Sequence, residues 1–294
     1  MRIRDAYSSG SPVFSFEFFP PKTEKGAQNL MRTVSDLRDA VQPDFVSVTS
    51  GAGGSERQRT HEVVTRIQSD LGITVMAHQT CVGSSRDAIR ESIARLVSAG
   101  IENVLALRGD APSDPPTDGQ ASGISAQGFE HATDLIGFLA DEFDVSIGAA
   151  CYPESHPESS TPEDDLHWTK VKVERGAGFL ISQLFFDNRD YFDFVGRCRA
   201  AGIEVPIVPG IMPITNVGQI ERFTKMCGAT IPDELGERLH AVEDDLGAVM
   251  ATGIEHAITQ CRELLERGAP GLHFYTLNKS HATRSILAAI RLLK

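Results

Sequence analysis

The sequence lacks the features that mark secreted, membrane and nucleic-acid-binding proteins. Its five cysteines are widely spaced and form no Cys-x-x-Cys pair, which predicts free thiols in a reducing compartment instead of disulfides or a zinc site. No apolar run approaches the roughly 20 residues needed to span a bilayer, and the first ten residues hold no secretory signal. The formal net charge of −12 would repel phosphates, so neither nucleic acid nor an anionic membrane is an expected partner. We therefore expect a cytoplasmic protein.

Metal-binding spacing is also missing. His78 and His156 are candidate ligands, and Glu154 and Glu158 flank the second of them. No further His or Cys completes a recognisable ligand set. We expect no metal, and we interpret these side chains as polar contacts to an organic cofactor.

Short apolar runs alternate with amphipathic stretches along the whole chain. A length of 294 residues and a hydrophobic share of 41% suit one α/β barrel, which typically needs about 250 residues. Continuous apolar strands are typical of a parallel sheet covered by helices. The eight predicted strands are residues 13–18, 45–49, 73–78, 104–108, 145–150, 179–185, 205–211 and 271–275.

The segments between these runs have helical periodicity. Residues 88–99, 164–175 and 191–201 repeat apolar side chains at three and four spacings, and each stretch ends at a glycine. This rhythm is shared by barrels and by open doubly wound sheets. Eight strands favour a (βα)8 TIM barrel, with residues 1–294 forming a single domain; the open sheet remains the alternative.

Two insertions interrupt the rhythm. Residues 111–125 are rich in Pro, Asp, Ser and Gly, which predicts an exposed loop after the fourth strand. Residues 231–267 predict extra helices between strands seven and eight, starting near Pro232. A glycine-rich segment, 51–55, could cradle a phosphate, but it lacks a dinucleotide or P-loop spacing, and a flexible turn explains it better.

Polar side chains collect where the predicted strands end. The carboxyl ends of parallel strands meet on one rim of a barrel, which is where such folds build active sites. A single polar residue there would carry little information, whereas seven of eight strands predict a site. These residues are Glu17, Thr49, His78, the run 108–110, Tyr152, Gln183 and Tyr275.

Glu17 is the leading candidate for acid–base chemistry. Because side chains alternate along a strand, Glu17 shares a face with Ser15 and Phe19, while Phe16 and Phe18 should point toward the helices. A carboxylate in a poorly solvated barrel mouth should have a raised pKa and could act as a general acid. The alternative is a structural pair with a neighbouring cation.

Arg108, Gly109 and Asp110 end the fourth strand. Glycine allows a ligand to approach the backbone, and the Asp110 carboxylate can accept hydrogen bonds from a heterocycle. A turn with a local Arg–Asp pair explains the spacing equally well. An adhesion motif is a poor explanation, because this tripeptide recurs by chance in proteins and here it directly follows a predicted buried strand.

The remaining candidates have structural explanations as well. Tyr152 could stack on a flat ligand or simply stiffen a proline-braced loop. Lys172 could reach a diphosphate or remain a solvated helix lysine. Phe223 lies on a predicted helix, where core packing is the default.

Taken together, these segments resemble the methylenetetrahydrofolate reductase family of flavoenzymes. The matching stretches keep the family's order along the chain. They are residues 16–21, 46–49, 105–110, 152–157, 183–187, 209–213 and 273–278.

The resemblance implies a bacterial-type catalytic domain that reduces 5,10-methylenetetrahydrofolate to 5-methyltetrahydrofolate in two half-reactions. FAD would be bound noncovalently, and NADH or NADPH would reduce it. Glu17 and Asp110 would be catalytic, with Glu17 as the general acid. Flavin contacts would be Thr49, His78, Leu107, Arg108, Gly109, Asp110, His131, Ala132, Tyr152, His156, Asp165 and Lys172. Substrate contacts would be Glu17, Gln183, Gln219, Phe223, Tyr275, Leu277 and Lys279.

The chain departs from the family pattern at three of these places. Gln79 stands where Leu is common, His131 where Tyr is common, and Lys279 where Arg is frequent. Lysine keeps the charge but loses the bidentate fork of arginine. Because the chain ends soon after strand eight, we expect no regulatory domain and no inhibition by S-adenosylmethionine. The family implies a homo-oligomer.

Two rival functions remain. A Schiff-base aldolase or metal lyase would need a lysine in a strand or a ligand cluster, and the predicted strands contain neither. A non-catalytic relative that binds folate and assists a methyltransferase complex would not need Glu17, Asp110 and Gln183. The sequence does not distinguish NADH from NADPH.

Overall fold

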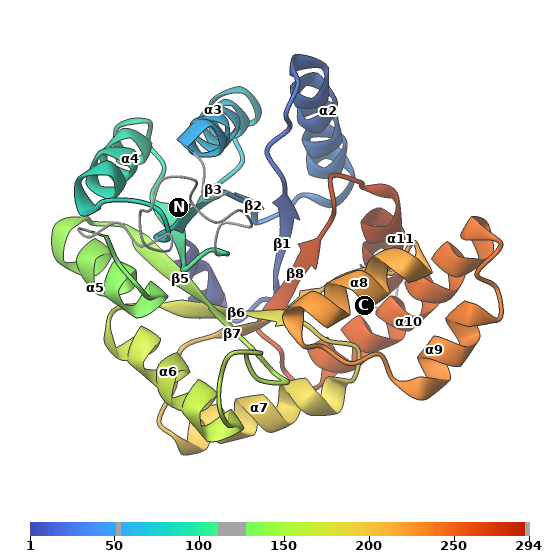
Figure 1. Ribbon diagram of the computed structural model, residues 1–294. Coiled ribbons are helices and arrows are strands. Elements are labelled where there is room, and N and C mark those ends of the chain that lie inside the picture. Colours follow the sequence, from blue (N-terminus) through green and yellow to red (C-terminus); the bar gives the residue numbers. More distant parts are fainter. Residues whose placement is uncertain (51–53, 111–127, 292–294) are drawn as a thin grey trace, which may run out of the picture.

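Eight parallel strands close into a barrel in the order β1 to β8, so the expected (βα)8 fold is confirmed (Figure 1). The computed structural model describes residues 1–50, 54–110 and 128–291. The predicted loop at 111–125 and most of the glycine-rich segment lie outside these residues. The strands are β1 Val13–Phe18, β2 Phe45–Val48, β3 Val75–Thr80, β4 Asn103–Leu107, β5 Ser146–Cys151, β6 Phe179–Leu184, β7 Ile207–Ile211 and β8 Gly271–Tyr275.

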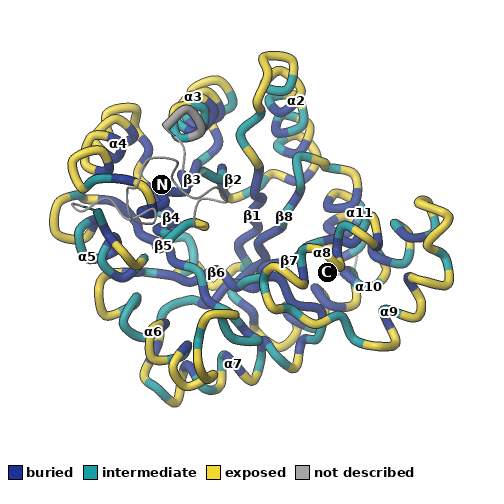
Figure 2. Tube along the Cα trace, in the orientation of Figure 1, coloured by how far each residue is buried: buried dark blue, intermediate teal, exposed yellow. Residues whose placement is uncertain are grey.

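Helices follow the strands and surround the barrel, with their exposed faces outward (Figure 2). The extra helices predicted between strands seven and eight are present, and Pro232 is the N-cap of α9. The helices are α1 Ile3–Ala6, α2 Glu24–Val41, α3 Gly54–Leu71, α4 Arg86–Ser98, α5 Ala132–Glu142, α6 Pro162–Glu174, α7 Asn188–Ala200, α8 Val217–Cys227, α9 Asp233–His240, α10 Leu246–Glu266 and α11 His281–Arg291, and a short 3-10 helix, η1 Tyr7–Ser9, follows α1.

Strand β1 shows the predicted alternation of faces. Phe16 and Phe18 are fully buried in the layer between barrel and helices, in the same cluster as Leu30 and Val34 of α2. Ser15 and Glu17 point into the lumen, where their side chains contact β8 and β3. The apolar side chains therefore attach the helix, and the polar ones are left for the interior.

The amino-terminal half of the lumen is packed with apolar side chains. Val13, Phe45, Met76 and Phe179 belong to one buried cluster, and Ile3 of α1 joins it. Gly148 makes room for Phe179, because a Cβ on this glycine would lie 2.6 Å from the phenyl ring. The lumen is filled on this side, as in other small barrels, so a ligand can approach only from the carboxyl ends of the strands.

Only β1 and β8 have the predicted bounds. β2, β4, β5 and β6 differ by one residue at one or both ends, and the largest differences are in β3 and β7. The apolar run that starts at Ile73 begins to pair only at Val75, and it continues to Thr80. The run at 205–211 pairs from Ile207, after Pro206. Apolar side chains continue beyond the ladder because they remain buried under the helices, while hydrogen bonding is set by the neighbouring strands.

Candidate active site

The predicted strand-end residues share the carboxyl rim of the barrel, because all eight strands are parallel. Register places Glu17 of β1 opposite Ser47 of β2 and Tyr275 of β8. Thr276 Oγ1 donates a 2.6 Å hydrogen bond to the Glu17 carbonyl and ties the two strand ends together. The Asn278 side chain makes two hydrogen bonds to the backbone of Phe19: its Oδ1 accepts from the N–H at 2.8 Å, and its Nδ2 donates to the carbonyl at 3.0 Å. The mouth at β1 and β8 is thus held by side-chain bonds to backbone.

Glu17 lies between two histidines inside the mouth. Its Oε2 is 3.3 Å from Nε2 of His78 and 3.4 Å from Nε2 of His273. Nδ1 of His273 lies 2.8 Å from Oγ of Ser15. The exposed fraction is 8% for Glu17, 6% for His78 and 0% for His273, so the cluster is shielded from solvent.

The expectation of a raised pKa for Glu17 is wrong. Burial favours the neutral acid, but the two imidazoles favour the carboxylate more strongly, and together they lower the pKa of Glu17 from 4.5 to about 2. Burial of Glu17 can be inferred from the sequence of β1 alone, whereas the two histidines that lower its pKa lie on β3 and β8. Neither histidine is a sequence neighbour of Glu17.

Strand β4 ends in the predicted Arg108–Asp110 turn. Gly109 has a φ of +85°, and a Cβ there would lie 2.9 Å from Cβ of Thr80, so only glycine fits without strain. The Arg108 guanidinium is paired with Glu158 through both terminal nitrogens, with Nη2–Oε1 at 2.7 Å. Arg108 therefore pairs with Glu158, which follows β5, and not with Asp110 as the turn alternative predicted. Asp110 is exposed. Leu107, before the turn, is half-buried.

Strand β5 and helix α6 bring together Tyr152, His156, Asp165 and Lys172. Tyr152 and His156 pack edge to face with centroids 4.6 Å apart, and Lys172 Nζ lies 5.8 Å above the tyrosine ring. Lys172 donates a 2.8 Å hydrogen bond to the Ala150 carbonyl, so it is not a solvated helix lysine. Burial lowers the pKa of Lys172 and raises the pKa of Asp165, and each partly offsets the other's shift by Coulombic attraction.

The N-terminus of α5 carries the predicted His131 and Ala132. The His131 ring stacks on Trp168 of α6, with centroids 6.2 Å apart and an interplanar angle of 24°. Trp168 is the only tryptophan of the chain, and 49% of it is exposed. Sequence reasoning missed it, although Trp168 follows Asp165 by three positions and precedes Lys172 by four, which puts all three on one helix face.

A groove of about 620 Å³ opens beside the end of β8. Its lining includes four predicted substrate contacts, Gln219, Tyr275, Leu277 and Lys279. Leu277 has a φ of +51°, as non-glycine residues seldom do, and such strained backbone is common at functional sites.

Of the described residues that line this groove, three are basic and none is acidic, in a chain whose net charge is −12. The sequence analysis had named only Lys279. Arg222 and His281 come from α8 and α11, and helix packing, not sequence proximity, brings them here.

The other predicted contacts lie at the rim or on the side of the groove. Gln183 is the penultimate residue of β6, and its Oε1 accepts a 2.9 Å hydrogen bond from Leu184 N–H. Phe223 packs partly buried against the cluster that contains Leu184 and Ile214, as the packing alternative predicted. Thr49 follows β2, and its N–H donates to the Phe18 carbonyl at 2.9 Å.

Unpartnered polar atoms and the set of charged donors fit a dinucleotide cofactor. Within the described parts of the chain, the buried Thr80 Oγ1 has no hydrogen-bond partner, and His78 Nε2 has none besides its 3.3 Å ion-pair contact with Glu17. Both lie on β3 at the mouth, and unsatisfied buried polar groups are costly unless a ligand completes them. Arg108 and Lys172 supply cations for a diphosphate, and Asp165 supplies an acceptor for ribose hydroxyls. Among the described residues, no three His, Cys, Asp or Glu side chains have metal-binding geometry.

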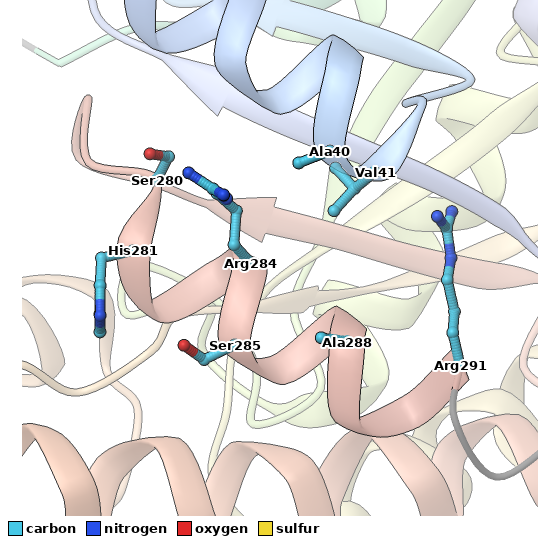
Figure 3. A pocket seen from close by; sticks show the side chains of 8 residues that line it. All are labelled: Ala40, Val41, Ser280, His281, Arg284, Ser285, Ala288 and Arg291. Carbon is cyan, nitrogen blue, oxygen red and sulfur yellow. The ribbon is translucent and has the colours of Figure 1, made fainter.

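A second cavity, of about 500 Å³, lies between α2 and α11 on the outside of the barrel (Figure 3). Arg284 and Arg291 rise from α11 toward α2, and Arg291 packs over the Phe14 ring at 5.2 Å. No predicted site residue lines this cavity. It belongs to the seam by which α11 attaches to the barrel, and not to the rim.

All five cysteines are free, and four of them are buried, as predicted. Over the ranges that the structure covers, no helix is both long and apolar enough for a bilayer.

A family model described as methylenetetrahydrofolate reductase matches residues 2–291. The 5,10-methylenetetrahydrofolate reductase of Salmonella typhimurium is 37% identical over 272 residues, covering 92% of this chain and 88% of that protein. A probable methylenetetrahydrofolate reductase (NADH) of Oryza sativa subsp. japonica is 39% identical over 306 residues, covering 100% of this chain and 50% of that protein. The chain thus spans about half the length of its plant relative.

Among solved structures, an uncharacterized protein from Clostridium thermocellum that binds two copies of 5-methyl-5,6,7,8-tetrahydrofolic acid has a TM-score of 0.65 at 17% identity. The match covers 99% of both chains. This likeness shows a shared fold.

Proposed function

The chain belongs to the methylenetetrahydrofolate reductase family, and on that basis we propose that it reduces 5,10-methylenetetrahydrofolate to 5-methyltetrahydrofolate with FAD and NADH or NADPH. The observation that carries the proposal is the buried Glu17 carboxyl group, held by two imidazoles at the mouth of a barrel and close to a groove lined by Gln219, Tyr275 and Leu277. Opening of the folate imidazolidine ring requires delivery of a proton, and a carboxylate in contact with two imidazoles beside a binding groove is a group through which a proton can be delivered.

The flavin would lie over the ends of β2 to β5. When bound, FAD supplies the hydride chemistry, accepting hydride from the nicotinamide and passing it to the substrate. The proposed contacts are Thr49, His78, Leu107, Arg108, Gly109, Asp110, His131, Ala132, Tyr152, His156, Asp165 and Lys172.

The chain's own residues supply acid–base and electrostatic help. Glu17 would deliver a proton to N10 of the substrate, which opens the five-membered ring and leaves a cationic iminium at N5. The Asp110 carboxylate would stabilise that positive charge. Gln183 would hold the pterin ring, with Phe223 and Tyr275 as apolar walls.

The groove would take the carboxylate-bearing tail of the folate. Lys279 lies in its lining with Arg222 and His281, so a positive pocket exists within an acidic protein. Binding of 5-methyltetrahydrofolic acid by the C. thermocellum barrel supports a folate in this fold.

The test begins with the purified protein as it is isolated. We expect flavin absorbance, oxidation of NADH with menadione as acceptor, and reduction of methylenetetrahydrofolate by the reduced enzyme. A colourless protein that oxidises no NADH after addition of FAD, yet binds methyltetrahydrofolate, would support the non-catalytic alternative. A borohydride-trapped adduct with a carbonyl substrate would support an aldolase.

A further inference from the structure

His273 is the most enclosed ionisable residue of the mouth, and nothing above gives it a role. Its ring stacks on Phe45 with centroids 6.3 Å apart and meets Tyr275 edge-on at 5.4 Å. Both ring nitrogens face polar atoms, with Nδ1 2.8 Å from Ser15 Oγ and Nε2 3.4 Å from Glu17 Oε2. The ring is therefore fixed in plane and in direction.

The chain Ser15–His273–Glu17 can hold one proton in two ways. On Nε2 it gives an imidazolium and a carboxylate; on Oε2 it gives a neutral imidazole and a carboxylic acid. In both arrangements Nδ1–H donates to Ser15 Oγ, so no heavy atom has to move between them. Exchange along this line needs no water and no change of rotamer.

His78 is a weaker candidate for this role. It also lies within ion-pair distance of Glu17, at 3.3 Å. Its Nε2, however, has no aligned hydrogen bond among the described residues, and the proposed function places it against the flavin. His273 by contrast has a partner for each nitrogen.

The other groups that face His273 do not compete for the proton. Tyr275 donates its hydroxyl to the Ser182 carbonyl at 2.7 Å, and burial raises the pKa of that phenol well above its ordinary value. Phe45 on β2 is apolar. Glu17 is therefore the ionisable side chain with which the ring can exchange a proton, and His78 approaches Glu17 from β3.

We propose that His273, oriented by Ser15, is the positioning residue that holds a proton beside Glu17 and passes it to Glu17 for protonation of the substrate. This inference rests on the proposed function. The proton first passes from His273 Nε2 to Glu17 Oε2, so the N–H bond breaks and the O–H bond forms. The Glu17 O–H bond then breaks as the substrate N–H bond forms, which leaves a carboxylate and a neutral imidazole. A proton from solvent water restores His273 before the next turnover.

This arrangement reconciles an acid role with the low pKa of Glu17. The carboxylate does not have to take its proton directly from bulk water, because a proton on His273 Nε2 can pass to it along the 3.4 Å contact. The pH dependence of the reaction is then set by the joint protonation of Glu17 and His273, and not by Glu17 alone.

The test is the pH profile of folate reduction in the FAD-loaded enzyme, followed by stopped flow after reduction of the flavin with NADH. In Ser15→Ala the imidazolium loses the acceptor of its Nδ1–H, so we expect the alkaline limb to move about one pH unit lower. In His273→Gln we expect the rate at pH 7 to fall about tenfold or more, with a flattened alkaline limb. Reduction of the flavin by NADH should keep its wild-type rate in both variants.

His240→Gln is the control, because this exposed histidine of α9 pairs with Glu221 and Glu243 and belongs to neither the Glu17 cluster nor the groove lining. It should leave both half-reactions and the pH profile unchanged. If His273→Gln does not fold, the smaller Ser15→Ala change still decides the matter. Unmoved pH profiles in variants of an active enzyme overturn the role of His273, whereas a wild-type enzyme that reduces no methylenetetrahydrofolate overturns the proposed function itself.

Discussion

Oε2 of Glu17 on β1 lies 3.3 Å from Nε2 of His78 on β3, although β2 separates the two strands in the barrel. The contact therefore crosses the lumen. It places an acid and an imidazole at the same depth below the rim, where little water can screen them. This contact and the 3.4 Å contact between Glu17 Oε2 and His273 Nε2 of β8 determine the expected behaviour of Glu17.

Replacing Glu17 with Gln should separate the two half-reactions. We expect flavin reduction by NADH at the wild-type rate and folate reduction slowed by about 10²- to 10⁴-fold, since only the second step needs the acid. Stopped-flow traces of each half-reaction measure this. Glu102→Gln is the control, because Glu102 pairs with the N-terminal amine, away from the mouth. Survival of both half-reactions would remove Glu17 from the mechanism.

Glu17 should also make stability depend on pH. Its folded pKa of about 2 lies below 4.5, so its contribution is present above pH 4.5 and is lost as the pH falls through 2. The difference in free energy of unfolding between wild type and Glu17→Gln should therefore narrow by up to about 3 kcal/mol between pH 4.5 and pH 2. Denaturant titrations along that range measure it. If the free energies of unfolding of wild type and Glu17→Gln change with pH by the same amount, the folded protein does not hold the Glu17 carboxylate ionised.

Replacing Asp110 with Asn should have a milder effect. Asp110 is exposed at the end of β4, so its charge acts across more solvent than that of Glu17. We expect the folate half-reaction to slow by about tenfold, with flavin reduction changed less. A folate half-reaction as fast as that of wild type would leave Asp110 without an electrostatic role.

Trp168 should report binding of the flavin. It is the only tryptophan, and it stacks on His131 while sharing a helix face with Asp165 and Lys172. We expect its fluorescence to be quenched when FAD is added to protein stripped of flavin. In Lys172→Met the midpoint of this fluorescence titration should move to a higher FAD concentration, because the variant lacks a cation that would contact the FAD diphosphate. Unchanged emission at saturating FAD would place the cofactor elsewhere.

Gly148 and Gly196 should respond in opposite directions to alanine. A Cβ at Gly148 would lie 2.6 Å from the fully buried Phe179 ring, so Gly148→Ala should lower the free energy of unfolding by about 1–3 kcal/mol. Gly196 lies inside α7 with nothing within 4 Å of the added carbon, so Gly196→Ala should raise it by about 0.5–1 kcal/mol. Thermal or denaturant unfolding tests both. A stabilising Gly148→Ala would mean that the lumen is less tightly packed than the structure shows.

Local pattern was enough to predict the strands and the faces they present. The alternation in β1 placed Phe16 and Phe18 against the helices and Glu17 inside, and the structure agrees. Glycines at the ends of helical stretches and Pro232 before α9 marked real boundaries. Such signals depend on a few neighbouring residues, which is why they could be read in order along the chain.

The partners of the candidate site could not be predicted in this way. His273 lay within a recognised stretch but received no role, because only closure of the barrel brings β8 beside β1. Arg222 and His281 join Lys279 for a similar reason, through packing of α8 and α11 around one groove. The pairing of Arg108 with Glu158 likewise joins two loops that are distant in sequence.

The sequence by itself determined which residues are strands, which side chains face inward, and that polar groups gather at one rim, because these follow from periodicity and from parallel order. Only the tertiary structure decided the charge of Glu17. Desolvation can be inferred from one strand, whereas the opposing effect of two imidazoles depends on distances of 3.3 and 3.4 Å that exist only once β1, β3 and β8 surround the same lumen.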